Sequence, residues 1–138
     1  MKGLPTLIRL RKFELEEKRR TLAEKEAAAA EIERQINALD EAVAREQDAA
    51  RRSQEVAFAY PAFARMAIDR RRDLIEALAI AQREVEVAAE EVTIAYQELK
   101  KFEVAQANRI KREKYEASIR EQNLLDEMAI ESFRRAPH

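Results

Sequence analysis

The side chains that most often carry catalysis are scarce in this chain of 138 residues. There is no cysteine to act as nucleophile or metal ligand, and the only histidine is the last residue, His138, where a catalytic base is hard to hold. The 27 Asp and Glu stand three or four positions from many of the 26 Lys and Arg, a spacing typical of ion pairs on solvated helices. The only glycine is Gly3, which excludes a glycine-rich phosphate loop. We therefore expect no enzyme, no metal site and no cofactor.

The elements that carry these side chains are expected to be long helices. Turns draw on Gly and Pro, yet between residues 6 and 136 the only such residue is Pro61. The residue before a proline is biased away from helical angles, and proline suits the first position of a helix. We predict a single domain over residues 1–138: a helix over about 6–53 capped by Thr6, a turn over about 54–60 and a second helix over about 61–134.

Apolar residues recur every seven positions in both predicted helices. In the first helix they are Ile8, Leu15, Leu22, Ala29, Ile36 and Val43. In the second helix they are Ala67, Leu74, Ala81, Ala88, Ala95 and Phe102, with a companion series at Leu78, Val85, Val92 and Leu99. Sustained heptads predict helices that pack as a coiled coil. The predicted fold class is all-α, an antiparallel two-helix coiled-coil hairpin with a C-terminal helical overhang.

The register of this hairpin has two solutions that differ by one heptad. In the preferred register the numbers of facing residues add up to 117, so Ile36 faces Ala81 and the turn is centred beside Pro61. In the other they add up to 110, so Ile36 faces Leu74 and Arg71 enters the seam. The first is preferred because it keeps this arginine out of the core and puts the turn beside the proline.

The preferred register predicts three surfaces for partners. At the turn lie the apolar residues Phe58, Tyr60, Phe63 and Met66. At the open end, residues 1–20 with net charge +4 lie beside residues 97–116 with net charge +2. The basic residues expected there are Arg9, Arg11, Lys12, Lys18, Arg19, Arg20, Lys111, Arg112 and Lys114. Residues from Ala117 onward outrun the first helix and offer a contact face at Leu124, Leu125, Met128 and Phe133.

The sequence also indicates where the protein acts. No apolar run approaches the roughly 18 residues of a membrane span. Basic residues such as Arg9 interrupt the apolar residues near the N-terminus, whereas a signal peptide needs an unbroken apolar stretch. We therefore expect a cytoplasmic protein, and the net charge of −1 argues against a nucleic-acid partner.

Several segments are distinctive beyond their periodicity. The opening MKGLPTLIRL is followed by EKRR at residues 17–20, and FAY and FAR fall within residues 58–65. Farther on come LKKFE at residues 99–103 and LDE at residues 125–127, followed by Ala129. In these segments the sequence resembles the FliJ family, the stalk-like component of the flagellar type III export ATPase complex, especially its alphaproteobacterial forms.

The resemblance implies a set of partners. FliJ proteins form hairpins similar to the central stalk of rotary ATPases, insert their open end into the hexameric flagellar export ATPase, and link it to the cytoplasmic domain of the export gate membrane protein. They also handle export chaperones. A Tyr-x-x-Phe pattern for gate binding matches Tyr60 and Phe63, and the first helix matches at Gln35 and Leu39. This sequence departs from the family's aromatic positions at Ala42 and Glu46. The protein would then lie at the flagellar basal body, peripheral to the inner membrane through the gate.

Two other functions stay open on the residues alone. One is a generic coiled-coil scaffold or chaperone-escort protein without a rotary ATPase partner. The other is a helical arm that binds RNA through its basic open end, which strongly salt-dependent binding would support. A pull-down that asks for the export ATPase separates both from the FliJ hypothesis.

Overall fold

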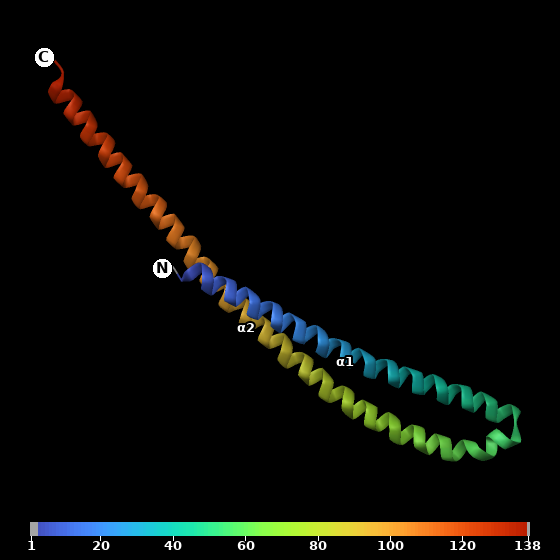
Figure 1. Cartoon of the computed structure of the whole chain (residues 1–138). Coiled ribbons are helices and arrows are strands. Elements are labelled where there is room, and N and C mark those ends of the chain that lie inside the picture. Colours follow the sequence, from blue (N-terminus) through green and yellow to red (C-terminus); the bar gives the residue numbers. More distant parts are fainter. Residues whose placement is uncertain (1–2, 138) are drawn as a thin grey trace. The chain divides into compact units, whose positions relative to one another are not determined.

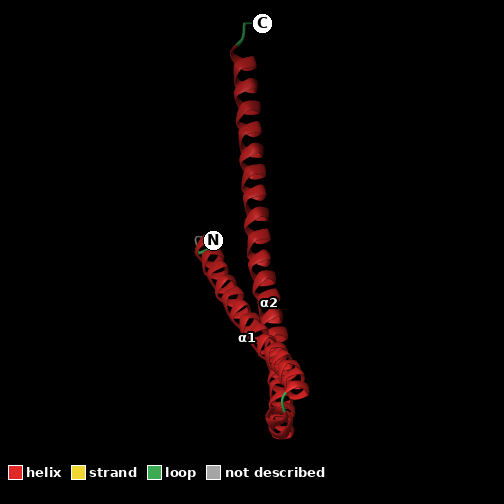
Figure 2. Cartoon of the chain, turned by 90° about the vertical axis from the view of Figure 1, so that its right-hand side faces the viewer, coloured by secondary structure: helices red, strands yellow, loops and turns green. Residues whose placement is uncertain are grey.

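The computed structural model describes residues 3–137, and nearly all of them are helical. Helix α1 spans Leu4–Arg52 and helix α2 spans Gln54–Arg135, with Ser53 alone between them (Figure 1). Figure 2 shows loop only at this break and at the chain ends, and no strand in the described part of the chain. The two helices pack against each other in opposite directions, which confirms the predicted all-α hairpin. His138 lies outside the described residues.

The chain divides into two compact units. The central unit is Phe13–Ala95, and the terminal unit combines Met1–Lys12 with Tyr96–His138. Each unit contains one part of α1 and one part of α2. Each therefore has its own helix-to-helix packing.

The predicted heptad positions form the core of both units. The buried residues of the central unit are Leu15, Ala29, Ile36, Ala67, Leu74, Ala81 and Ala88. Those of the terminal unit are Leu4, Ile8 and Leu99. Other seam positions, such as Leu22 and Val85, are half-buried. This is expected because two helices cover only one stripe of each other.

Ion pairs between the helices fix the register of the central unit. They are Lys18 Nζ with Glu91 Oε2 at 3.2 Å, Lys25 Nζ with Glu84 Oε2 at 3.4 Å, and Arg71 Nε with Asp40 Oδ1 at 2.9 Å. The numbers of the paired residues add up to 109 or 111. The preferred register of 117 is therefore wrong, and the register of 110 is the one found.

The behaviour of Arg71 explains why the preferred register failed. The register of 110 brings this residue opposite Leu39, a position at which the sequence predicts a buried charge. Its side chain instead remains about half exposed and bonds the carboxylate of Asp40. An arginine can cover a seam with its aliphatic stem while its charged head stays in water, so its presence at a heptad position does not exclude this register.

Helix α2 begins earlier than predicted because Ser53 caps it. The backbone N–H of Val56 donates to Ser53 Oγ at 3.4 Å, and the N–H of Ala57 donates to the Ser53 carbonyl at 3.0 Å. Serine is among the preferred N-cap residues, and Glu55 in the first turn favours the helix dipole. Residues 54–60, predicted as a turn, are therefore helical.

Pro61 lies inside α2 instead of starting it. An interior proline removes one backbone hydrogen bond and strains the preceding turn, at a cost of about 3 kcal/mol. Both Pro61 and Ala57, whose carbonyl loses its partner, are exposed, so water can take over that bond. The helix tolerates the proline because this part of it is solvated.

Helix α1 also begins earlier than predicted, at Leu4 instead of Thr6. The N–H of Leu7 donates to the carbonyl of Gly3 at 2.9 Å, which closes the first turn. Pro5 then lies in that turn, where a missing N–H has no cost. The early start extends the seam by one position, to the buried Leu4.

Candidate protein-interaction surfaces

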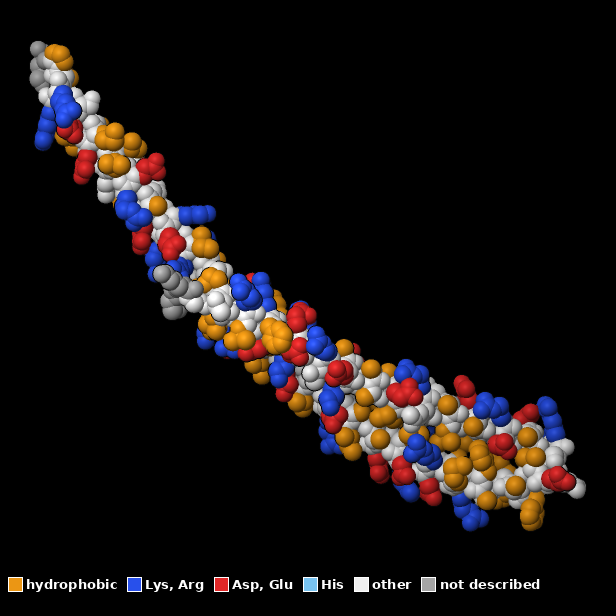
Figure 3. Space-filling view, viewed as in Figure 1, with side chains coloured by type: hydrophobic (Ala, Val, Ile, Leu, Met, Phe, Trp, Pro, Cys, Tyr) orange, Lys and Arg blue, Asp and Glu red, His pale blue; other side chains and the backbone are white. Residues whose placement is uncertain are grey.

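Four side chains near the start of α2 form the turn cluster, which is Phe58, Tyr60, Phe63 and Met66. Phe58 is 91% exposed and Met66 is 53% exposed. Tyr60 and Phe63 are half-buried and pack together, with ring centroids 6.4 Å apart and ring planes tilted by 40°. Figure 3 shows basic and apolar side chains together at the surface of this end of the central unit. The cluster exposes more aromatic surface than closing the hairpin needs.

Gln35 and Leu39 lie farther along the hairpin than the turn cluster. The register brings Leu39 opposite Arg71, and Arg71 follows Phe63 by eight positions on α2. At 1.5 Å per residue this is about 12 Å along the helix. Leu39 is a half-buried seam residue, whereas Gln35 is exposed. The structure thus does not merge these two residues with the turn cluster into one contact patch.

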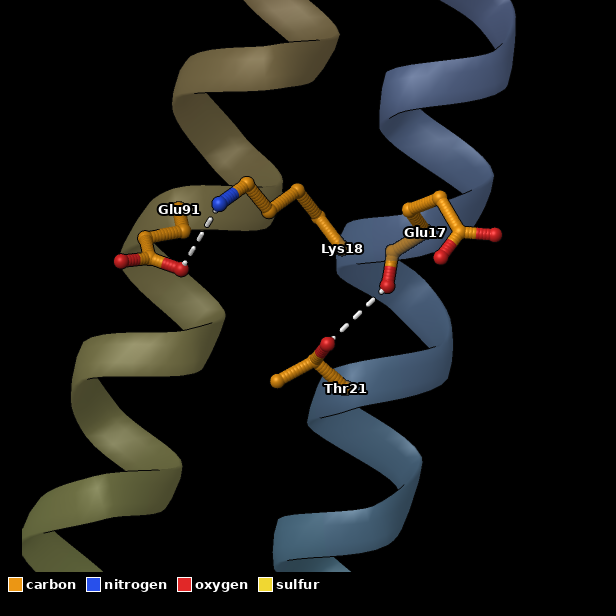
Figure 4. Close-up of polar contacts among 4 residues, drawn as sticks. All are labelled: Glu17, Lys18, Thr21 and Glu91. Carbon is orange, nitrogen blue, oxygen red and sulfur yellow. Dashed lines mark hydrogen bonds and ion pairs between the residues drawn. The ribbon is translucent and has the colours of Figure 1, made fainter.

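Three of the predicted basic residues, Lys18, Arg19 and Arg20, lie in the central unit and form ion pairs. Figure 4 shows Lys18 reaching across to Glu91 of α2 at 3.2 Å. In the same view the Thr21 hydroxyl donates to the backbone carbonyl of Glu17 at 3.1 Å. Arg19 and Arg20 bond the carboxylates three positions before them, at 2.8 and 2.9 Å. All these groups are substantially exposed, so the pairs exchange readily with solvent and with other charged partners.

The basic residues of the terminal unit fall into two sets. On α1, Arg9 and Lys12 are exposed, while the half-buried Arg11 guanidinium stands 5.5 Å from the centre of the Phe102 ring. The other set is Lys111, Arg112 and Lys114, all exposed.

The second set does not lie beside α1 as predicted. Within this unit Arg11 of α1 lies over the Phe102 ring of α2, so Leu4, the first residue of α1 and seven positions before Arg11, reaches no farther along α2 than about residue 109. The basic residues from Lys111 onward are therefore past α1, which agrees with the exposure of every described residue after Arg109. The expected meeting of the two basic segments depended on the register of 117 and is corrected with it.

The apolar residues of the overhang do not share one face. Leu124 and Met128 are 57% exposed and stand four positions apart, so they lie on the same side of α2. Phe133 follows Leu124 by nine positions, which is about half a turn away at 100° per residue. The predicted contact face at Leu124, Leu125, Met128 and Phe133 is thus two narrower surfaces.

Sequence reasoning missed one further surface, a stripe of large apolar residues on α2. Ile80, Val87 and Ile94 are each more than half exposed. A shallow groove beside the stripe is lined by Thr21 and Ala88, among others. The seven-residue spacing of Ile80, Val87 and Ile94 is a signal that could have identified the stripe. The core residues Ala81 and Ala88 repeat with the same spacing one position later, and from this spacing only the core was predicted.

Two further properties of the described residues concern metal ions and membranes. Within residues 3–137 no three acidic, histidine or cysteine side chains are grouped so that they could hold a metal ion. Over the same residues, no helix is both long and apolar enough to cross a membrane.

A family model described as the flagellar FliJ protein matches residues 1–138. No curated protein matches the sequence, and no solved structure matches the fold.

Proposed function

The chain belongs to the flagellar FliJ protein family and is a flagellar export component, and we propose that it joins the export ATPase to the export gate. The observation that carries the proposal is the turn cluster, where Phe58 is 91% exposed although the core beside it is complete without that ring. Exposed aromatic side chains that pack little on their own protein are typical anchors of protein interfaces. The chain itself would hydrolyse no ATP.

We assign the gate contact to the turn cluster. Tyr60 and Phe63 match the family's gate-binding pattern and form one packed pair, with Phe58 standing outward beside them. In the register of 110, Leu39 lies about 12 Å and Gln35 about 18 Å farther along the hairpin than Phe63. Both would belong to the same contact only if the gate covers about 18 Å of the hairpin surface beyond Phe63. A folded domain is large enough for that span, so we retain both residues in the proposal.

We assign the ATPase contact to the basic residues near the start of α1 and to those at positions 111, 112 and 114 of α2. Arg9 and Lys12 are exposed on α1, and so are Lys111, Arg112 and Lys114 on α2. Arg11, Lys18, Arg19 and Arg20 would take part by exchanging their present partners for acidic groups of the ring. Binding through such exposed charges should weaken as salt rises. The overhang residues Leu124, Leu125, Met128 and Phe133 are then available to export chaperones.

A pull-down with two baits tests whether the two contacts are separate. Phe58→Ala and Phe63→Ala should each weaken binding to the cytoplasmic domain of the gate by about tenfold or more, because aromatic anchors dominate interface energies. Binding to the export ATPase should be unchanged. Phe13→Ala is the matched control, since Phe13 is a 63% exposed phenylalanine on α1.

The two substituted positions carry different risks for folding. Phe58 touches little, so its variant should keep full helicity by circular dichroism, whereas Phe63→Ala also removes the contact with Tyr60. Equal loss of gate and ATPase binding in the fully helical Phe58→Ala protein would contradict separate sites. Unchanged gate binding in both variants would remove the turn cluster from the proposal.

A further inference from the structure

Three large apolar side chains on α2 have no role in the hairpin. Ile80, Val87 and Ile94 are 55%, 56% and 59% exposed, and all belong to the central unit. Seven residues are close to two helical turns, so the three side chains follow one another along one face. The neighbouring Ala81 and Ala88 are buried against α1. The stripe therefore stands beside the core and adds nothing to it.

The flanks of this stripe carry charges arranged in a definite way. On the side toward α1, Glu84 bonds Lys25 at 3.4 Å and Glu91 bonds Lys18 at 3.2 Å. These carboxylates are thus neutralised within the hairpin.

On the other flank stand Arg83 and Glu90, seven positions apart, opposite in charge and exposed. The flanks favour a partner that repeats the same spacing with the opposite order of charge.

We propose that the stripe is a contact surface for a second copy of this chain, in an antiparallel dimer with two-fold symmetry. Equal spacing makes the stripe complementary to its own reverse. Val87 would meet Val87 of the second copy on the symmetry axis, and Ile80 would meet Ile94 of the second copy. The same register brings Arg83 opposite Glu90 of the second copy, twice over, so that the flanking charges match.

The area buried by this pairing is small, and it determines how strongly two copies should associate. Glu84 would face Glu91 of the second copy, but the ion pairs with Lys25 and Lys18 offset the repulsion. Three apolar positions per copy bury less surface than a permanent dimer needs, so association should be weak and concentration-dependent. A small contact of this kind is best detected by a covalent trap.

Cysteine cross-linking provides that trap, because the natural chain has no cysteine. In the full-length protein, Val87→Cys should form a disulfide-linked dimer under mild oxidation. Ile80→Cys alone should not, because the two sulfurs would be 14 positions apart in register, about 21 Å. Mixing Ile80→Cys with Ile94→Cys should restore cross-linking. Ile68→Cys is the matched control, since Ile68 is 66% exposed and lies on nearly the opposite side of α2.

Two outcomes overturn the proposal. Cross-linking of Ile80→Cys with itself as efficient as that of Val87→Cys would mean a parallel or unspecific contact. Cross-linking of Val87→Cys no faster than that of Ile68→Cys would mean that the stripe does not bind a second copy, and that any occupant is a different protein.

Charge reversal gives a readout that does not depend on cysteine chemistry. By sedimentation equilibrium, Arg83→Glu should weaken self-association by about tenfold, because like charges are then opposed on both sides of the axis. Adding Glu90→Arg to it should restore association. Failure of the double variant to recover, with helicity intact, would contradict the antiparallel register.

Discussion

A designed disulfide between Ile36 and Leu74 tests the register that decides which residues of α1 and α2 face each other. The two residues are buried on facing helices, and the ion pairs around them bring them to the same level of the hairpin. We expect Ile36→Cys with Leu74→Cys to oxidise to an intramolecular disulfide. The matched pair is Ile36→Cys with Ala81→Cys, which the other register would favour.

The size of the effect follows from the loop that the disulfide closes. Residues 36 and 74 are 38 positions apart, and closing a loop of that length removes about 4 kcal/mol of unfolded-chain entropy at 25 °C. The control pair is displaced by seven residues, or about 10 Å along the helix, which exceeds the roughly 7 Å that a disulfide tolerates between Cα atoms. The first variant should therefore gain most of this stabilisation on oxidation, and the second should gain none.

The assay compares the oxidised and reduced forms of the same variant. The change in stability caused by losing the native side chains is therefore the same in both forms and cancels. Non-reducing electrophoresis reports the intramolecular bond as faster migration, and urea unfolding of the oxidised and reduced forms gives the free-energy difference. If the Ala81 pair oxidises faster, and oxidation stabilises it more, the register of 110 is refuted. The assigned levels of Leu39 and of Lys111 would then change with it.

Two smaller effects can be measured on the same protein. Ser53→Ala should lower the free energy of unfolding by about 1 kcal/mol, since it removes the cap of α2, whereas the exposed mid-helix Ser118→Ala should leave it nearly unchanged. The bonds from Arg34 and Gln35 hold the pKa of the Glu31 carboxyl below its usual value. Their small stabilisation is present above the ordinary Glu pKa and is lost as the pH falls through the lowered one, so Arg34→Ala should raise the Glu31 pKa in an NMR titration. A titration curve that is the same in both proteins would contradict this account.

The sequence was sufficient to predict the seam but not its register. Positions such as Ile36, Leu74 and Leu99 are identified by periodicity alone, because burying a stripe requires a seven-residue repeat whatever the partner is. A shift by one heptad leaves every seam position in the seam. The choice between the two registers then depends on where the turn lies. Two residues predict different turn positions, since Ser53 is a good helix N-cap and Pro61 suits the first position of a helix.

The start of α2 is determined by the capping residue Ser53 and not by Pro61. Pro61 is the stronger helix breaker in general, but its cost falls when the strained turn is solvated, while Ser53 supplies a side-chain bond to Val56. The members of the turn cluster still lie near the turn, since a shift of a few residues does not separate them. The distances from the cluster to Leu39 and from α1 to Lys111 could not be predicted, because both depend on the register.

The single residue between the helices has a consequence for how such chains can vary in length. One residue inserted into the paired part of α2 would rotate all later residues of that helix by about 100° about its axis. Their seam side chains would then face solvent instead of α1. A tolerated insertion must keep the heptad phase, and in an antiparallel pair it must occur at the same level in both helices. Because Ser53 is the only residue between the helices, the turn cannot absorb a residue that is inserted into one helix alone. Viable length variants of the paired region should therefore differ by about 14 residues at a time, with seven in each helix.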